Sequence, residues 1–265
     1  MAVLCSHPRS GTTLLEQVLD SHPSVISADE IQIMSEVAFG GIKIKAEKGE
    51  LSKDQPNGYP RNLIDALDSA SLDDVRELRQ AYWKGMEGAM QQSIGGRILL
   101  DKNPDFTLLL PLIARIFPDM RIIFALRDPR DVVISCFMLR LPLNHTSVHY
   151  LTLEQTARRY ANTMNAWFKI RDMLRNPWIY VRYEDTVSDL EGQARNSLEF
   201  LGLPWDEGVL DFHRRAQKKH VHSPTYEAVT KPLYTSSIGR WRNYERQLEP
   251  SLEILQPFVE AFGYA

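Results

Sequence analysis

Short apolar runs alternate along the chain with longer segments whose apolar residues recur at helical spacing. Five runs have the length and composition of buried strands: Ala2–Cys5, Val25–Ser27, Arg97–Leu100, Arg121–Leu126 and Trp178–Val181. The segments with helical spacing are Thr12–Asp20, Ile31–Phe39, Leu72–Gln92, Phe106–Phe117, Arg130–Leu139, Leu153–Leu174 and Val187–Leu201. Because strands that alternate with helices pair in parallel through right-handed crossovers, the pattern predicts an α/β fold of three layers, with helices flanking a central, mostly parallel sheet.

Two stretches depart from this alternation. Gly40–Arg61 is rich in Lys, Glu, Gly and Pro, which predicts a mobile loop, and Gln217–Ile238 is long, basic and irregular. The last stretch, "LEPSLEILQPFVEAFGYA", has the spacing of a closing amphipathic helix. Since no composition shift marks a second domain, residues 1–265 are predicted to form a single domain.

Composition and charge narrow the class of protein. The 265 residues are 43% hydrophobic and 25% charged, as in ordinary globular proteins, and the net charge is −3. This charge gives no overall positive field for nucleic acid or a membrane surface, so any anion site must be built locally. No apolar run approaches the ~18 residues of a membrane span, and no signal peptide is visible. Cys5 and Cys136 lie in apolar segments, which predicts buried free thiols.

The first strand-to-helix connection, "SHPRSGTT" at Ser6–Thr13, is typical of a phosphate-binding loop. A P-loop reads G-x-x-x-x-G-K-[ST]. Here Ser6 takes the first glycine position, Gly11 takes the second, Thr12 replaces the lysine and Thr13 keeps the hydroxyl. The N–H groups and the dipole of the following helix favour an anion at this end.

Arg9 restores a cation inside the loop, and Ser10, Thr12 and Thr13 supply hydroxyl donors. Without the lysine, and without an obvious Walker B acid, a triphosphate and its magnesium would be poorly held. The loop is therefore predicted to bind a phosphate with less charge to neutralise. The alternative is an ordinary strand-to-helix turn with chance Ser and Thr caps.

A second anion site is predicted in "FALRDPRDVVISCFM". Arg127 stands where a strand ends, Asp128 can cap the helix that follows, and Ser135 would face inward about two turns along that helix. An arginine and a serine placed in this way can hold one phosphate from two sides. The alternative is that Arg127 only pairs with a carboxylate such as Asp131.

The opening loop, "PRSGTTLLEQVLDSHP", resembles the 5′-phosphosulfate-binding loop of the sulfotransferases that use 3′-phosphoadenylyl sulfate (PAPS). The resemblance is strongest with the tyrosylprotein sulfotransferases and with bacterial sulfotransferases that often follow tetratricopeptide repeats, and it extends from Ala2 to about Tyr244. It implies a P-loop-type fold and transfer of a sulfuryl group from PAPS to a hydroxyl acceptor. The product would be adenosine 3′,5′-bisphosphate (PAP), with no metal required.

The resemblance also implies roles for the donor-binding residues. The loop residues that would hold the 5′-phosphosulfate are Arg9, Ser10, Gly11, Thr12 and Thr13. Arg127 and Ser135 would hold the 3′-phosphate. Tyr183, in "VRYEDTVSDL", maps to a donor contact, and the alternative for it is a half-buried packing tyrosine.

The late stretch "TYEAVTKPLYTSSIGRWRNYE" resembles the family loop that folds over the nucleotide. Within it, Thr225 aligns with a family serine that faces the transferring group. Lys231 lies in the part that covers the nucleotide, and Arg240 would stand on the 3′-phosphate side. The alternative is a solvated basic loop.

Sulfuryl transfer needs a base for the acceptor hydroxyl and positive charge beside the leaving phosphate. Glu30 follows the Val25–Ser27 strand and matches the position of the catalytic glutamate in the tyrosylprotein enzymes, so it is the predicted base, with Asp29 as the expected helix cap. Lys102 matches a family K-x-P segment and is the predicted acid or electrostatic partner, together with Arg9. An exposed loop lysine is the alternative for Lys102.

The seven histidines show no metal-ligand spacing, so a zinc site is not predicted. His22 or His145 is the alternative base. Two other functions remain open: a P-loop kinase for a small molecule, which would need magnesium and ATP, and a non-catalytic nucleotide-binding module.

The predicted partner is a hydroxyl-bearing acceptor, which could be a peptide tyrosine, a sugar, a lipid alcohol or a small phenol. A nucleic acid partner is not predicted, and a homodimer is possible. The resembling enzymes divide between the Golgi lumen and the bacterial cytoplasm. Because no signal or anchor is visible, we expect the cytoplasm, or the Golgi lumen if an N-terminal anchor has been trimmed.

Overall fold

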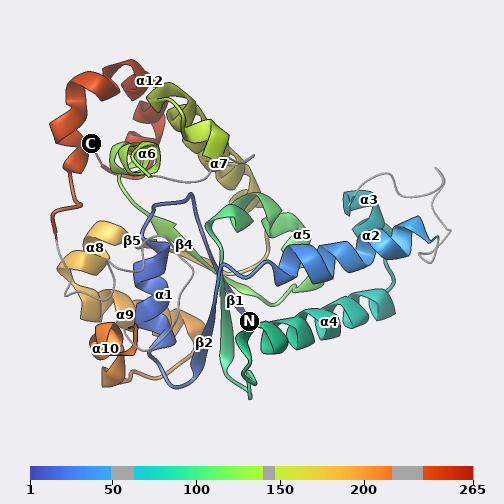
Figure 1. Ribbon diagram of the computed structural model, residues 1–265. Coiled ribbons are helices and arrows are strands. Elements are labelled where there is room, and N and C mark those ends of the chain that lie inside the picture. The colour runs from blue at the N-terminus through green and yellow to red at the C-terminus, as the bar shows by residue number, and fades with distance from the viewer. Residues whose placement is uncertain (49–62, 140–146, 217–234, 265) are drawn as a thin grey trace.

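A computed structural model describes residues 1–48, 63–139, 147–216 and 235–264. Its five strands form one sheet in the order β2-β3-β1-β4-β5, and every neighbouring pair is parallel (Figure 1). The strands are β1 (Ala2–Cys5), β2 (Val25–Asp29), β3 (Ile98–Lys102), β4 (Arg121–Leu126) and β5 (Trp178–Arg182). The predicted α/β fold with a central parallel sheet is confirmed, and each apolar run identified in the sequence is a strand.

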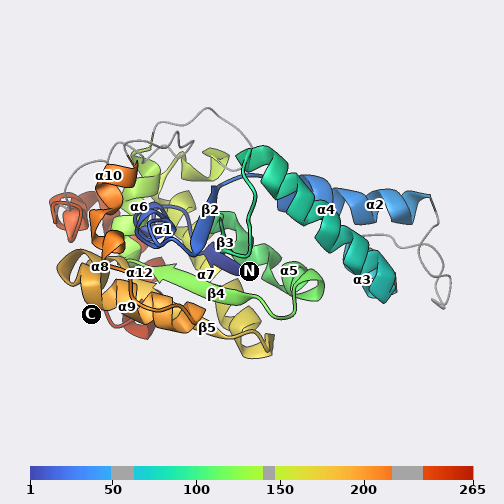
Figure 2. The ribbon, with the colours of Figure 1, turned by 90° about the horizontal axis from the view of Figure 1, so that it is seen from below.

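Helices connect and cover the strands (Figure 2). The α-helices are α1 (Thr12–Asp20), α2 (Gly40–Glu47), α3 (Leu63–Ser69), α4 (Leu72–Met90), α5 (Leu110–Ile116), α6 (Pro129–Phe137), α7 (Leu153–Met173), α8 (Tyr183–Ser188), α9 (Leu190–Leu201), α10 (Phe212–Ala216) and α12 (Glu245–Ala261). A π-helix, η1 (Met34–Phe39), and the 3₁₀ helices η2 (Pro104–Leu109), η3 (Ser147–Tyr150), η4 (Glu207–Asp211) and η5 (Arg240–Tyr244) complete the described elements.

The sheet separates two apolar cores. On one face, Leu15 and Val18 of α1 pack with Leu198 of α9 and with Ile123 of β4. The other face carries the larger core, which α5, α6, α7 and α12 cover. Helices α2, α3 and α4 extend beyond this second layer as an arm (Figures 1 and 2). Alternation of side chains along each strand produces the two cores, because successive residues point to opposite faces.

Side-chain caps start two of the helices. Ser71 and Asp74 form a reciprocal capping box at the start of α4. As predicted, Asp128 caps α6 by accepting from the Arg130 N–H, with Pro129 at the first helical position. Cys5 and Cys136 are buried free thiols, and burial raises the pKa of each to about 12. The closing amphipathic segment forms α12.

Other boundaries differ from the sequence prediction. Gly40–Glu47 forms α2 rather than a mobile loop. Ile42 of this helix is fully buried in the larger apolar core, and its packing outweighs the polar composition of the segment. The rest of the predicted Gly40–Arg61 loop, from residue 49, lies outside the described residues, as does most of Gln217–Ile238. The helix predicted at Ile31–Phe39 starts only at Met34 and is a π-helix.

Two predicted helices are divided in the structure. The segment predicted at Phe106–Phe117 begins as the 3₁₀ helix η2, and its α-helical part starts at Leu110 with a proline in its first turn. The helix predicted at Val187–Leu201 is two helices, since Asp189 ends α8 and its side chain caps α9 through the Gly192 N–H. A side-chain cap of this kind stabilises the start of a new helix by about 0.5–2 kcal/mol, which favours two helices here over one.

Candidate active site

The loop of residues 6–11 lies between the carboxyl ends of β3 and β4, where ligands of open parallel sheets bind. Ser6 donates its hydroxyl to the Ala125 carbonyl at the end of β4, and its N–H binds the Pro104 carbonyl at 3.3 Å. Thr107 Oγ1 in turn donates to the Ser6 carbonyl at 2.7 Å. Ser6, which replaces the first P-loop glycine, therefore fixes the loop to both neighbouring strand ends.

Backbone conformation brings the loop into the N-terminus of α1. Arg9 has φ 73° and Gly11 has φ 90°, both in the left-handed region. Gly11 is the N-cap of α1, and a Cβ added to it would lie 2.7 Å from Cδ2 of Tyr183. Position 11 therefore requires glycine for its dihedral angle and also for the close approach of Tyr183.

The structure brings the two predicted anion sites together. Arg9 Nε donates to Ser135 Oγ at 3.0 Å, which joins the loop to α6. Arg127 Nη1 donates to the Arg9 carbonyl at 3.2 Å, and its guanidinium carbon lies 4.8 Å from the centre of the Tyr183 ring. Arg9, Ser135, Arg127 and Tyr183 thus form one continuous group around the end of α1.

Arg127 has one side-chain donor that no described residue accepts. Arg127 is only 8% exposed, its Nη2 donates to the Ser237 carbonyl at 2.7 Å, and its buried Nε has no hydrogen-bond partner among the described residues. A buried guanidinium N–H without an acceptor is costly, and a phosphate oxygen would satisfy it. The alternative expectation, an ion pair of Arg127 with Asp131, is wrong, because Asp131 instead accepts from the Gly239 and Trp241 N–H groups.

A buried charge cluster adjoins this edge of the sheet. Lys102 ends β3, is fully buried, and its Nζ lies 2.7 Å from both Asp29 Oδ1 and Glu30 Oε1 and 3.3 Å from Glu16 Oε2. Burial alone would lower the pKa of the Lys102 ammonium, but the attraction of Glu16, Glu30 and Asp29 outweighs burial and raises it. The alternative of an exposed loop lysine at 102 is wrong. The expectation that Asp29 caps the following helix is also wrong, because η1 has Ile33 as its N-cap and no side-chain cap.

Glu30 is the member of this cluster that reaches solvent. Its side chain is 35% exposed, against 0% for Lys102, 0% for Glu16 and 7% for Asp29. The backbone of Glu30 is held at φ 50°, and its N–H donates to the Lys102 carbonyl at 3.0 Å. A carboxylate on a fixed backbone, oriented by a buried ammonium and open on one side, has the geometry of a general base.

The other predicted site residues lie at the start of α1, near the C-terminal part of the chain, or outside the described residues. Ser10, Thr12 and Thr13 are buried at the start of α1. Arg240 is exposed at the first residue of η5, while Thr225, Lys231 and His145 lie outside the described residues. Tyr183 is half-buried and starts α8 directly after β5.

His22, the other alternative base, has a structural position. It is buried just beyond the C-terminal end of α1, its Nδ1 accepts from the Ser24 N–H, and its Nε2 lies 3.0 Å from the Pro204 carbonyl. The loop and Glu30 are at the opposite end of that helix from His22. The geometry therefore gives His22 no access to a ligand held by the loop.

Sequence reasoning missed two acids of this region, Glu16 and Glu184, and it named Asp131 only as a partner for Arg127. Glu16 could have been noticed as a carboxylate inside an apolar helix, and every residue of α1 is indeed buried. Asp131 and Glu184 carry no local signal, because their partners come from the C-terminal part of the chain. Over the described residues, no group of three or more His, Cys, Asp or Glu side chains could hold a metal ion, and no helix there is long and apolar enough to cross a membrane.

Comparison with known proteins points to one family. The model of the sulfotransferase family matches residues 2–207 of the chain. A protein of Aquifex aeolicus is 28% identical over 94% of this chain, which spans 31% of that protein's length. Protein-tyrosine sulfotransferase 1 of Danio rerio is 22% identical over 97% of this chain and 70% of its own length.

Solved structures share the fold at low sequence identity. The sulfotransferase domain of the Synechococcus PCC 7002 olefin synthase has a TM-score of 0.63 and 22% identity, covering 98% of this chain and 94% of that domain. Mouse sulfotransferase SULT7A1, solved in complex with PAP, has a TM-score of 0.53 and 17% identity, covering 98% of this chain and 83% of its own. These two structures support the α/β sheet architecture described above.

Proposed function

This chain belongs to the sulfotransferase family, and from that premise we propose that it moves a sulfuryl group from PAPS to a hydroxyl acceptor and releases PAP. The observation that carries the proposal is the joining of Arg9, Ser135 and Arg127 at the N-terminus of α1. Two cations from separate elements flank this end, and one of them, Arg127, has a buried N–H that no residue in the described part of the chain accepts. The arrangement suits a nucleotide with phosphate groups at both ends.

The loop residues and Arg9 would hold the 5′-phosphosulfate, where the first N–H groups of α1 add to the side-chain donors. Arg127 and Ser135 would hold the 3′-phosphate, and binding would divert donors that now contact the Ser135 hydroxyl and main-chain carbonyls. Tyr183 would hold Gly11 and the Arg127 guanidinium in place by packing against both. The predicted roles of Thr225, Lys231 and Arg240 remain part of the proposal.

The transfer step follows from the positions of Glu30 and Arg9. Glu30 would take the proton of the acceptor hydroxyl while the acceptor oxygen attacks the sulfur in line. The bond from sulfur to the bridging oxygen then breaks, and PAP leaves with the electron pair, beside the positive charge of Arg9. No proton needs to come from Lys102, because its three carboxylate neighbours stabilise the ammonium. We therefore infer that Lys102 orients Glu30 electrostatically rather than acting as an acid.

The acceptor class stays open in this proposal, with peptide tyrosine among the candidates because of the Danio rerio relative. The proposed location is the cytoplasm, with the Golgi lumen as the alternative if the full protein carries an anchor. A homodimer also remains a proposal, which sedimentation of the purified chain would test.

Thermal unfolding with metal chelated tests the donor site. We expect PAP to raise the melting temperature and ATP to do much less, since the loop lacks the P-loop lysine. A ligand that binds only the folded state at 100 times its Kd stabilises by about 2.7 kcal/mol. An increase that appears only with ATP and magnesium would support the small-molecule kinase instead.

Glu30→Gln tests the catalytic part. The variant keeps the size of the side chain and removes the basic oxygen, so we expect normal PAP binding and a loss of sulfuryl transfer of about 10²–10⁴-fold. Glu36→Gln, which changes a nearby carboxylate of η1, is the control. Full transfer activity in Glu30→Gln would remove Glu30 from the mechanism, and PAP binding without any transfer by the unmodified protein would support a non-catalytic module.

A further inference from the structure

We propose that Asp131 is a positioning residue for donor binding: it holds the segment Ser237–Trp241 against the first turn of α6, and so closes the 3′-phosphate end of the site. The inference rests on the proposed function only in taking the donor to be a nucleotide with a 3′-phosphate. It concerns a residue that does not itself touch the reacting group.

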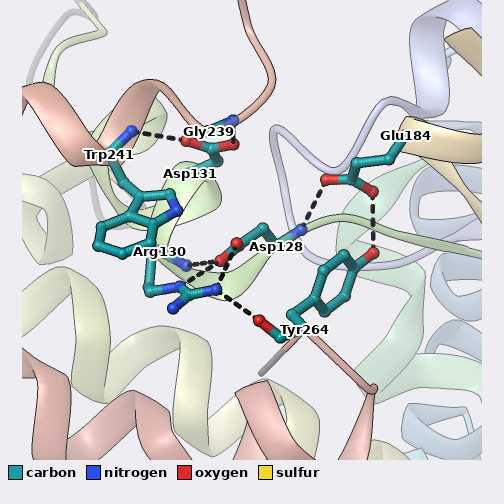
Figure 3. A network of polar contacts seen from close by, with 7 residues as sticks. All are labelled: Asp128, Arg130, Asp131, Glu184, Gly239, Trp241 and Tyr264. Atoms are coloured by element: carbon teal, nitrogen blue, oxygen red, sulfur yellow. Dashed lines mark hydrogen bonds and ion pairs between the residues drawn. The ribbon is translucent and has the colours of Figure 1, made fainter.

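The contacts of Asp131 carry the argument (Figure 3). Its side chain is 1% exposed, Oδ2 accepts from the Gly239 N–H at 2.7 Å, and Oδ1 accepts from the Trp241 N–H at 2.8 Å. Both carboxylate oxygens are thus used by main-chain donors more than a hundred residues away in the sequence. Hydrogen bonds to a buried ionised acceptor are among the stronger ones in proteins.

Arg127 makes the third connection to the same segment. It stands four residues before Asp131, and its Nη2 donates to the Ser237 carbonyl at 2.7 Å. Arg127, which is proposed to bind the 3′-phosphate, and Asp131 therefore hold opposite ends of one short stretch, Ser237–Trp241. If this stretch moved away, Arg127 would lose a partner that fixes its guanidinium, and the site would lose its cover on that side.

Neighbouring contacts make the attachment specific. Two guanidinium groups lie near the Trp241 ring, with Arg130 Cζ 4.0 Å and Arg242 Cζ 5.0 Å from its centre. Arg130 is itself held by two contacts to Asp128 at 2.8–2.9 Å and by the Tyr264 carbonyl at 2.7 Å. Glu184 then accepts from the Asp128 N–H and the Tyr264 hydroxyl (Figure 3). The first turn of α6 therefore holds the C-terminal part of the chain at two places, the Gly239–Trp241 stretch and Tyr264.

A simpler account is that Asp131 only interacts with the dipole at the start of α6. A matched acid elsewhere separates the two accounts. Asp73 also lies in the first turn of a helix, α4, but its side chain is 82% exposed, and its ion pair is with Arg76 of the same helix. A substitution at Asp73 therefore measures the helix effect together with one exposed ion pair, without any contact to a distant segment among the described residues.

The experiment compares Asp131→Asn with Asp73→Asn. Asparagine keeps the shape but turns an NH₂ group toward one of the two main-chain N–H donors. We expect PAP to bind Asp131→Asn about 10- to 100-fold more weakly, with a matching rise in KM for PAPS and a change in kcat of less than about threefold. Asp73→Asn should keep the affinity of the unmodified protein. Equal PAP affinity in all three proteins would overturn the proposal.

Hydrogen exchange of the unmodified protein gives a second measurement that does not depend on the variant folding. We expect PAP to slow exchange of the Gly239 and Trp241 amides, and unchanged exchange there on PAP binding would overturn the proposal. If the unmodified protein does not bind PAP at all, the proposed function fails, which is a different outcome from failure of the Asp131 role.

Discussion

Burial shifts the pKa values of two side chains, Asp101 and His7, far from their ordinary values. Burial raises the pKa of the Asp101 carboxyl to about 7, with repulsion from Glu16 adding to it, although a hydrogen bond from Tyr82 at 2.7 Å opposes the shift. Burial lowers the pKa of His7 to about 4. Both groups therefore favour their neutral forms in the folded protein, and they contribute to the pH dependence of stability with opposite signs.

Asp101→Asn should isolate one of these contributions. Between pH 4 and 7 the folded state holds the Asp101 proton more tightly than the unfolded state, so this group contributes stability at low pH that is lost as the pH rises through 7. The asparagine variant should lack this decline, which has a slope of at most about 1.4 kcal/mol per pH unit.

Urea unfolding at several pH values measures the effect, with exposed Asp119→Asn as the control. The His7 contribution, which increases stability as the pH rises from about 4 to 6.5, is the same in all three proteins and cancels in the comparison. An identical pH profile for the unmodified protein and Asp101→Asn would contradict the assignment.

At the scale of elements, one strand-loop-helix unit carries the proposed donor site. β1, the loop and α1 agree with the sequence prediction because their signals are local: an apolar run, a glycine and a periodic helix. The fit of this unit against α8 is not local, since Tyr183 occupies the space where a side chain at position 11 would lie. The helix start therefore depends on a residue distant in the sequence.

Gly11→Ala should test this dependence. The alanine would have φ near 90° and would force Tyr183 to move, so we expect a loss of at least about 1–2 kcal/mol in unfolding free energy and weaker PAP binding. Gly88→Ala is the matched control, because its Cβ would meet no atom within 4 Å inside α4 and should stabilise by about 0.5–1 kcal/mol. Chemical denaturation of both variants checks the opposite signs, and a stabilised Gly11→Ala would disprove the steric argument.

At the scale of the whole molecule, the sheet divides the apolar interior into two cores that share no buried residue. Ile113 of α5 belongs to the larger core and Ile123 of β4 to the smaller one, and both are fully buried. The loss of one methyl group in one core should therefore not affect packing in the other.

Ile113→Val and Ile123→Val should each cost about 0.5–1.5 kcal/mol, and the double variant should cost their sum within about 0.5 kcal/mol. Equilibrium unfolding of the two single variants and the double variant completes the cycle. A coupling energy well above this limit would show that the two cores respond as one packed unit.

The strands, most helices, the loop and the two cations can be predicted from the sequence, because each depends on residues close together in the chain. Hydrophobic periodicity predicts a strand or helix from a few neighbouring positions. Arg127 directly follows a predicted strand, and Arg9 lies in the loop after another. The helix α2 is the main element that the sequence does not predict, because its polar composition indicates a loop although Ile42 is buried.

Which charged side chains contact one another becomes clear only in the folded chain. The burial of Lys102 among Glu16, Asp29 and Glu30, the contact of Arg9 with Ser135, and the attachment of Gly239 and Trp241 to Asp131 each join segments that are far apart in sequence. The physical reason is that the energy of a charge depends on its burial and on its nearest partners, and neither quantity exists before the chain has folded.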